Sequence, residues 1–210
     1  MNIELSTKGL QKSFGSLVVA QDIALELPQG VRYALIGPNG AGKTTLINLL
    51  TGMIRPDAGS ILLGDNDITG LTAQARVKRG LVRTFQINTL FPQLNALESV
   101  TLAVLEREGT SGIWWRRLPV YRDAIDEAFG ILRSLGLADQ CHRPTREMAY
   151  GEQRLVEIAL ALATKPRVLL LDEPAAGVPK EESAGLFTAI AGLSEALTIL
   201  FIEHDMDVVF

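Results

Sequence analysis

The sequence has few of the residues that build disulfides or metal centres. Among its 210 residues are one cysteine, Cys141, and two histidines, His142 and His204. One cysteine cannot form a disulfide within the chain, and this set is too small to hold a structural zinc ion. No stretch of eighteen or more apolar residues occurs, so no membrane-spanning helix is predicted. The amino end lacks a basic region followed by an apolar one, so we expect a cytoplasmic protein without a secretory signal.

Charge of either sign is also modest. The 20 Lys and Arg residues against 24 Asp and Glu residues give a net charge of −4, and 47% of the chain is hydrophobic. This composition excludes a disordered chain and predicts one sizeable core, or one core with a small appended lobe. The acidic balance argues against a protein held mainly by nucleic-acid phosphates, so no nucleic-acid partner is expected.

The pattern along the chain predicts an α/β protein. Short strand-like segments fill residues 1–36, and residues from about 90 to 150 have helical spacing. In that helical part Ile125, Ala128, Phe129, Leu132 and Leu135 are expected to share one buried face. From residue 152 onward, helices and buried strands alternate, as in a parallel sheet with crossover helices. These segments are expected at Gln153–Ala163, Val168–Leu171, Glu181–Ala196 and Thr198–Ile202.

The segment GPNGAGKTT fits the phosphate-binding pattern G-x-x-x-x-G-K-[ST] and lies between a strand-like run and a helical one. Its glycines let the backbone wrap around phosphate oxygens, and the following helix N-terminus supplies N–H donors. Lys43 can reach the β- and γ-phosphates, and the Thr44 hydroxyl can bind Mg²⁺. The predicted nucleotide-binding residues here are Gly37, Pro38, Asn39, Gly40, Ala41, Gly42, Lys43, Thr44 and Thr45.

Two acids, Asp172 and Glu173, follow the apolar run Val168–Leu171. An unpaired carboxylate at the end of a buried strand is unfavourable, so a divalent cation, Mg²⁺, is expected beside Asp172. Glu173 can then polarise a water for attack on the γ-phosphate, although the pair alone is also compatible with an acidic turn. No Asn/Thr-Lys-x-Asp segment for guanine selection occurs, so the expected nucleotide is ATP.

Two polar residues are ambiguous by themselves. His204 follows an apolar strand-like run and Glu203, where an imidazole can lie over a phosphate or orient water. Gln86 can direct its amide to the metal or to the attacking water. However, a single histidine after a strand is more often structural, and an isolated glutamine carries little information. Only the order of all the motifs gives these two residues a catalytic meaning.

That order resembles the ATPase subunits of ABC transporters over essentially the whole chain. The motifs are GPNGAGKTT, Phe85-Gln86, MAYGEQRLVEIALAL, LLLDEP and Glu203-His204. The resemblance implies a P-loop NTPase fold of the ABC ATPase type, with an N-terminal antiparallel β subdomain, a mainly parallel core sheet and a helical subdomain. We expect a single domain, 1–210, with a β-rich opening at 1–36, a core at 37–87 and 152–210, and a helical subdomain at about 88–151.

The resemblance also implies roles for individual residues. Glu173 is the catalytic base, His204 is the switch histidine, and Gln86 links the nucleotide to membrane subunits. Phe14 stacks on adenine with Val19 nearby, although Phe14 could instead be a core residue. The implied catalytic residues are Lys43, Gln86, Glu173 and His204, and the implied Mg²⁺ ligands are Thr44, Gln86 and Asp172.

The family's signature, Leu-Ser-Gly-Gly-Gln, corresponds here to Met148–Glu152. Gly151 keeps the backbone N–H that can meet the γ-phosphate of an opposing subunit, whereas Ala149 and Tyr150 replace the serine and the first glycine. This variant, with RTFQ and DEPAAG, resembles the ATP-binding subunits of branched-chain amino acid importers.

Three features depart from the family or stand outside its pattern. The loop Ala176–Pro179 lacks the usual Asp, so contact between subunits there must rely on backbone groups or is weakened. The chain stops at Phe210, whereas family members usually continue, so we expect a shortened chain with exposed apolar surface. Trp114–Arg117 could touch lipid headgroups or a membrane partner, or could be an ordinary surface loop.

The resemblance implies two kinds of partner. A second ATPase subunit, identical or paralogous, would pair head-to-tail around two ATP molecules. Integral membrane permease subunits would hold the protein on the inner face of the cell membrane. The alternatives are a soluble ABC ATPase acting on DNA or ribosomes, and a truncated nucleotide-binding subunit without activity.

Overall fold

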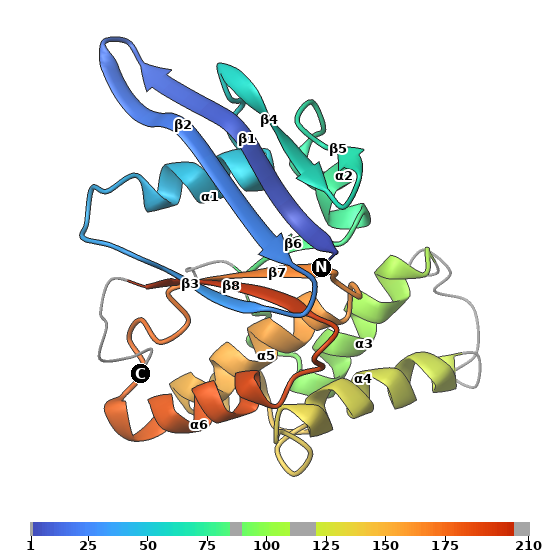
Figure 1. Ribbon diagram of the computed structural model, residues 1–210. Helices are drawn as coiled ribbons and strands as arrows, with labels where there is room; N and C mark the ends of the chain where they lie inside the picture. The colour runs from blue at the N-terminus through green and yellow to red at the C-terminus, as the bar shows by residue number, and fades with distance from the viewer. Residues whose placement is uncertain (1, 85–89, 110–120, 204–210) are drawn as a thin grey trace. The chain divides into compact units, whose positions relative to one another are not determined.

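The computed structural model describes residues 2–84, 90–109 and 121–203 (Figure 1). Its contacts divide the chain into two compact units. Unit 1 comprises Met1–Arg83, Pro166–Glu173 and Glu195–Phe210, and unit 2 comprises Thr84–Lys165 and Pro174–Ser194. No helix among the described residues combines the length and the apolar character needed to cross a membrane.

One sheet of unit 1 is antiparallel, with the strand order β2-β1-β4-β5. The long strands β1 (Ile3–Phe14) and β2 (Leu17–Pro28) form a hairpin, which Figure 1 shows in blue. Its turn contains Gly15 in a left-handed conformation, with φ of 60°, which a glycine adopts without steric cost. The strands β4 (Ala58–Leu63) and β5 (Asn66–Asp67) continue the sheet.

The other sheet of unit 1 is parallel, with the order β3-β8-β7-β6. Its two central strands are almost entirely buried, as the apolar runs in the sequence predict. Because the strands are parallel, their carboxyl ends lie at one edge of the sheet. The strands are β3 (Arg32–Ile36), β6 (Leu81–Arg83), β7 (Val168–Asp172) and β8 (Thr198–Glu203).

The predicted α/β fold with an antiparallel and a parallel sheet is confirmed, but the strands do not follow the expected segments. β3 falls within residues 1–36 yet pairs with β8, and β4 falls within residues 37–87 yet pairs with β1. The strand pairing depends on partners far along the chain, which composition does not reveal. The predicted subdomain boundaries, 1–36, 37–87 with 152–210, and about 88–151, remain a prediction.

Two helices complete unit 1. Helix α1 (Lys43–Thr51) contacts both β2 and β6, and Gly52 ends it in a left-handed conformation. Helix α2 (Ala73–Lys78) begins at Thr72, whose hydroxyl accepts a hydrogen bond from the Ala75 N–H. The apolar core of this unit is formed by leucines and isoleucines from both sheets and from α1.

Unit 2 is helical. It contains α3 (Ala96–Arg107), α4 (Arg122–Ser134), the 3₁₀ turn Thr145–Glu147, α5 (Tyr150–Leu162) and α6 (Lys180–Ala191). Asn95 and Glu98 form a reciprocal capping box at the start of α3. The Arg107 guanidinium joins three helices, because it bonds both Glu127 on α4 and the Ala163 carbonyl after α5. The hydrogen bonds from Arg107 hold the pKa of Glu127 below its usual range.

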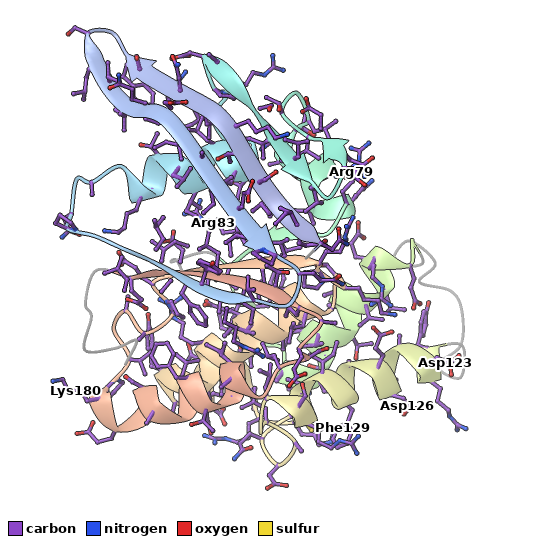
Figure 2. The ribbon with its side chains drawn as sticks, viewed as in Figure 1. Arg79, Arg83, Asp123, Asp126, Phe129 and Lys180 are labelled. Atoms are coloured by element: carbon purple, nitrogen blue, oxygen red, sulfur yellow. The ribbon has the colours of Figure 1, made fainter. Side chains whose placement is uncertain are left out.

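Two of the helices differ from their predicted limits. Helix α5 begins at Tyr150 rather than Gln153, because the Glu152 carboxylate accepts a hydrogen bond from the Ala149 N–H and caps the helix there. Helix α6 ends at Ala191, five residues before the predicted end. In α4, Ala128 and Leu132 are buried as expected, but Phe129, labelled in Figure 2, lies at the edge of that face and is 37% exposed.

A fully buried arginine joins the end of α1 to α2. The Arg76 guanidinium donates hydrogen bonds to the carbonyls of Leu49 and Leu50 at 2.7 and 2.6 Å, and to those of Leu71 and Thr69. Burial lowers the pKa of Arg76. The guanidinium thus satisfies carbonyls that the end of α1 leaves without helical partners.

Arg76→Met is expected to lower the free energy of unfolding by about 3 kcal/mol, because it removes hydrogen bonds to four carbonyls, two of them fully buried. Urea denaturation followed by circular dichroism measures this change. The control is Arg79→Met, on the exposed residue after α2 that Figure 2 labels. Equal stability of the two variants would contradict this role of Arg76.

Candidate functional site

The predicted phosphate loop joins β3 to α1. Gly40 and Gly42 both adopt left-handed conformations, with φ of 82° and 86°. A Cβ atom on Gly42 would lie 3.1 Å from the Val19 carbonyl oxygen, so β2 passes directly against this part of the loop. Glycine is therefore required at position 42 both for its backbone conformation and for the space that a side chain would fill.

A pocket of about 250 Å³ opens in unit 1 at the start of α1. It brings together most of the residues that the sequence predicts for a nucleotide site, including the predicted base Glu173. The N-terminus of α1 faces this space with backbone donors and the positive end of its dipole, an arrangement that attracts anions. The lining residues are Leu17, Val19, Asn39, Gly40, Ala41, Gly42, Lys43, Thr44, Thr45, Glu173 and Ile202.

Lys43 lies in this pocket and also stabilises its rim. Its ammonium group donates hydrogen bonds to the carbonyls of Gly37 and, at 3.0 Å, of Pro38. Gly37 and Pro38 thus contribute to the site by holding the lysine. An ammonium group has three donors, so Lys43 can also serve a phosphate oxygen while it keeps the loop closed.

Glu173 follows β7 in an unusual backbone conformation. Its φ is 46°, in the left-handed region that residues other than glycine seldom adopt. Its N–H donates a hydrogen bond to the Ile202 carbonyl at 3.0 Å, which anchors the residue to β8. Strained backbone conformations of this kind cluster at functional sites, where surrounding contacts hold them. Here the conformation brings Glu173 to the pocket.

Asp172, the last residue of β7, has a different environment from the one its sequence position predicts. Its side chain is 8% exposed, and its carboxylate forms an ion pair with the Arg83 guanidinium at the end of β6. Arg83 in turn donates a hydrogen bond to the Asn48 side-chain oxygen at 2.8 Å. The buried carboxylate therefore has a protein cation as its partner and is not unpaired, as the sequence argument assumed. Its role as a Mg²⁺ ligand stays a prediction.

Phe14, predicted to stack on adenine, lies at the end of β1 opposite Leu17. Its ring is 48% exposed, and the Lys12 ammonium lies 5.5 Å from the ring centre. The pocket is lined by Leu17 and Val19 rather than by Phe14. Leu17 was missed because an apolar residue in a hairpin carries no distinctive signal. The stacking role of Phe14 stays a prediction.

Gly151 lies in the first turn of α5, in unit 2. Its N–H donates a hydrogen bond to the Glu182 carboxylate of α6 at 2.9 Å. The next turn holds Arg154, which donates to the Tyr150 hydroxyl at 2.9 Å and pairs with Glu157 at 2.7 Å. Burial raises the pKa of Glu157, although its bond to Arg154 opposes this. The Glu182 carboxylate thus contacts the Gly151 N–H, which the sequence resemblance predicts to meet the γ-phosphate of an opposing subunit.

Several sequence predictions fall on residues that the structure does not describe. Gln86, His204 and Trp114–Arg117 all lie outside the described ranges. Within those ranges, no group of three or more acidic, histidine or cysteine side chains is arranged to hold a metal ion.

Comparison with known proteins agrees with this geometry. The model of the ABC transporter family matches residues 20–176, most of the chain.

The chain belongs to the ABC transporter family. Two similar proteins are the high-affinity branched-chain amino acid transport ATP-binding proteins LivG of Escherichia coli K12, 42% identical, and BraF of Pseudomonas aeruginosa, 37% identical. Each match covers 98% of this chain and 83% of the relative.

A solved structure has the same fold. It is the ADP conformation of an ATP-binding cassette of an ABC transporter, 30% identical, with a TM-score of 0.84 over all of this chain and 84% of that one. The pocket around Lys43 therefore belongs to an ABC ATPase, which binds nucleotide and hydrolyses ATP.

Lys43→Ala is expected to weaken ATP binding to this ABC ATPase at least about tenfold, because it would remove the predicted charge-assisted hydrogen bond to phosphate and would loosen the loop. Titration with a fluorescent ATP analogue measures the affinity. Lys8→Ala, on β1 and away from the pocket, is the control. Unchanged affinity in the Lys43 variant would contradict its role.

Proposed function

We propose that this ABC ATPase powers an importer for branched-chain amino acids. The observation that carries the ATPase part of the proposal is that the glycine loop, Lys43, Thr44 and Glu173 meet in one pocket. The substrate class is supported by the relatives LivG and BraF, which are named for transport of branched-chain amino acids.

The residues at the pocket fit a nucleotide bound with Mg²⁺. Magnesium is usually held by one or two protein oxygens together with phosphate oxygens and waters. The Thr44 hydroxyl and the Asp172 carboxylate offer such oxygens, and the Gln86 amide is predicted to add a third. The metal ion would neutralise charge on the phosphates, while Lys43 and the N–H groups of the loop hold them in place.

Hydrolysis needs a water directed at the γ-phosphate. Glu173 lies in the pocket with its backbone fixed by β8, so its carboxylate can accept a proton from that water. His204, which directly follows β8, is proposed to contact the γ-phosphate. Leu17 and Val19 provide an apolar wall for the base and sugar, and Phe14, outside that lining, is proposed to stack on the adenine.

Two subunits are proposed to form a head-to-tail dimer, in which Gly151 of one meets the nucleotide held by Lys43 of the other. In that arrangement the Gly151 N–H must exchange its bond to Glu182 for a phosphate oxygen. Both acceptors are anions, so they compete for the positive N-terminus of α5.

The other proposed partners are membrane permease subunits, which would hold the ATPase on the cytoplasmic face. Unit 2 has a pocket of about 240 Å³ whose lining is mainly apolar and suited to a cytoplasmic helix of a permease. Phe91 and Leu102 are strongly exposed at this place. The lining residues are Leu90, Phe91, Ser99, Leu102, Ala103 and Leu160.

The proposed function is tested by reconstitution. The ATPase is co-expressed with candidate permease subunits, placed in proteoliposomes with ATP inside, and supplied with binding protein and radiolabelled leucine. Leucine uptake that requires ATP is the expected result. Co-purification with nucleic acid or ribosomes, without permeases, would instead indicate a soluble ABC ATPase. Absence of phosphate release would indicate a subunit without activity.

Glu173→Gln is expected to keep ATP affinity within about twofold but to lower turnover at least about a hundredfold, because the amide cannot accept the proton. Phosphate release and nucleotide titration measure the two effects. The control, Glu195→Gln, changes an exposed glutamate of the same unit. Turnover at the parent rate would exclude Glu173 as the base.

Glu182→Gln is expected to strengthen ATP-driven dimerisation about tenfold, because a neutral amide competes less with phosphate for the Gly151 N–H. Sedimentation at several protein concentrations measures dimerisation, in the Glu173→Gln background to prevent turnover. Glu181→Gln, on the neighbouring exposed glutamate, controls for charge alone. Equal dimerisation in the two variants would contradict the competition.

A further inference from the structure

The ion pair beside the pocket reaches three elements of unit 1. Arg83 ends β6 and Asp172 ends the neighbouring parallel strand β7, where Arg83 lies opposite Leu170 in the register. The guanidinium therefore extends two residues along β7 to reach the carboxylate. Its other terminal nitrogen donates to Asn48 on α1, and Figure 2 labels Arg83 between α1 and the parallel sheet.

Asn48 connects this pair to the phosphate site. It follows Thr44 by four residues, so the two side chains share one face of α1. The guanidinium thus joins the helix face that bears the Thr44 hydroxyl to the strand end that bears Asp172. These are the two oxygen donors that the proposed function assigns to the metal side of the nucleotide.

We propose that Arg83 is a positioning residue for ATP hydrolysis, which fixes the Asp172 carboxylate and holds it at a set distance from Thr44 through Asn48. This inference rests on the proposed role of Asp172.

The chemistry of arginine explains the choice of residue. A guanidinium is planar and presents separate N–H groups in a fixed fork, so it can bond Asp172 and Asn48 at once in one orientation. It bonds one carboxylate oxygen of Asp172, Oδ2, and leaves the other oxygen for a further ligand. A lysine would keep the charge but would present all its donors on one nitrogen, and it would bridge the two partners poorly.

The residue that precedes β7 provides a control. Just before β7, Arg167 pairs at 2.5 Å with Glu4, whose side chain is 4% exposed. This ion pair also compensates a buried carboxylate of unit 1, but neither residue lines the phosphate pocket. Arg167 itself is about half exposed, so its loss reports what removing the partner of a buried carboxylate does to stability at a place away from the nucleotide.

The test compares Arg83→Gln, Arg83→Lys, Asn48→Ala and Arg167→Gln. The measurements are affinity for a fluorescent ATP analogue in Mg²⁺ and in EDTA, the Mg²⁺ concentration at half-maximal ATP hydrolysis, and thermal stability. Residues that orient a metal ligand typically change metal affinity tenfold or more, so Arg83→Gln is expected to raise the half-maximal Mg²⁺ concentration about tenfold. Its nucleotide affinity in EDTA is expected to stay within about twofold.

Arg83→Lys is expected to recover the thermal stability that Arg83→Gln loses. Its half-maximal Mg²⁺ concentration is expected to stay raised, as in Arg83→Gln. Asn48→Ala keeps the ion pair and is expected to shift the Mg²⁺ dependence about threefold in the same direction. Arg167→Gln is expected to lower stability and leave the Mg²⁺ dependence unchanged. If Arg83→Gln does not fold, Arg83→Lys and Asn48→Ala decide the question.

The positioning role would be overturned if the Arg83 and Asn48 variants, like Arg167→Gln, kept the Mg²⁺ dependence of the unchanged protein. It would also be overturned if Arg83→Lys had that same Mg²⁺ dependence. Asp172→Asn separates this failure from failure of the proposed function. If that variant shifts the Mg²⁺ dependence and the Arg83 variants do not, only the inference about Arg83 fails. If Asp172→Asn has no effect, the proposed metal-side role of Asp172 fails first.

Discussion

The parallel pairing of β3, β8, β7 and β6 is the constraint on which the rest of this site depends. Parallel strands end at the same edge, so residues that are distant in the sequence meet there. The phosphate loop leaves this edge after Ile36, and Asp172 and Glu173 reach it from β7. A change in the register of β7 by one residue would move both acids by one position and turn the side chains of the strand to the opposite face.

Buried charged groups in unit 1 have specific partners. Asp172 pairs with Arg83, Glu4 pairs with Arg167, and the Arg76 guanidinium bonds four carbonyls. Removal of one member of a buried ion pair lowers the free energy of unfolding, because the other charge is left without water or a partner. These arginines thus hold helices and strands of unit 1 at defined positions, and Arg83 does so beside the pocket.

The contact between Gly151 and Glu182 illustrates how a functional donor is satisfied within one subunit. A helix N-terminus has N–H groups without helical partners, and a carboxylate from α6 accepts one of them. The same donor is proposed to serve a phosphate when two subunits meet. Dimerisation then exchanges one anion for another at α5, so the strength of the Glu182 contact affects how readily the dimer closes.

Local sequence was sufficient for the elements whose chemistry lies within one short segment. The pattern GPNGAGKTT predicts a glycine loop followed by a helix, and the apolar runs before Asp172 and Glu203 predict buried parallel strands; the structure has all of these. Such features depend on backbone conformation and hydropathy, which neighbouring residues determine. Helix limits were less predictable, because the start of α5 depends on the cap from Glu152.

The partners of the functional side chains were decided by tertiary structure. Arg83 and Asp172 are 89 residues apart in the chain, and Gly151 and Glu182 are 31 apart. Leu17 reaches the pocket only because β2 passes beside the phosphate loop. The sequence by itself singled out the residues that are proposed to bind phosphate and accept a proton. Strand register and helix packing decided which charges they face, because these bring together groups that no local pattern connects.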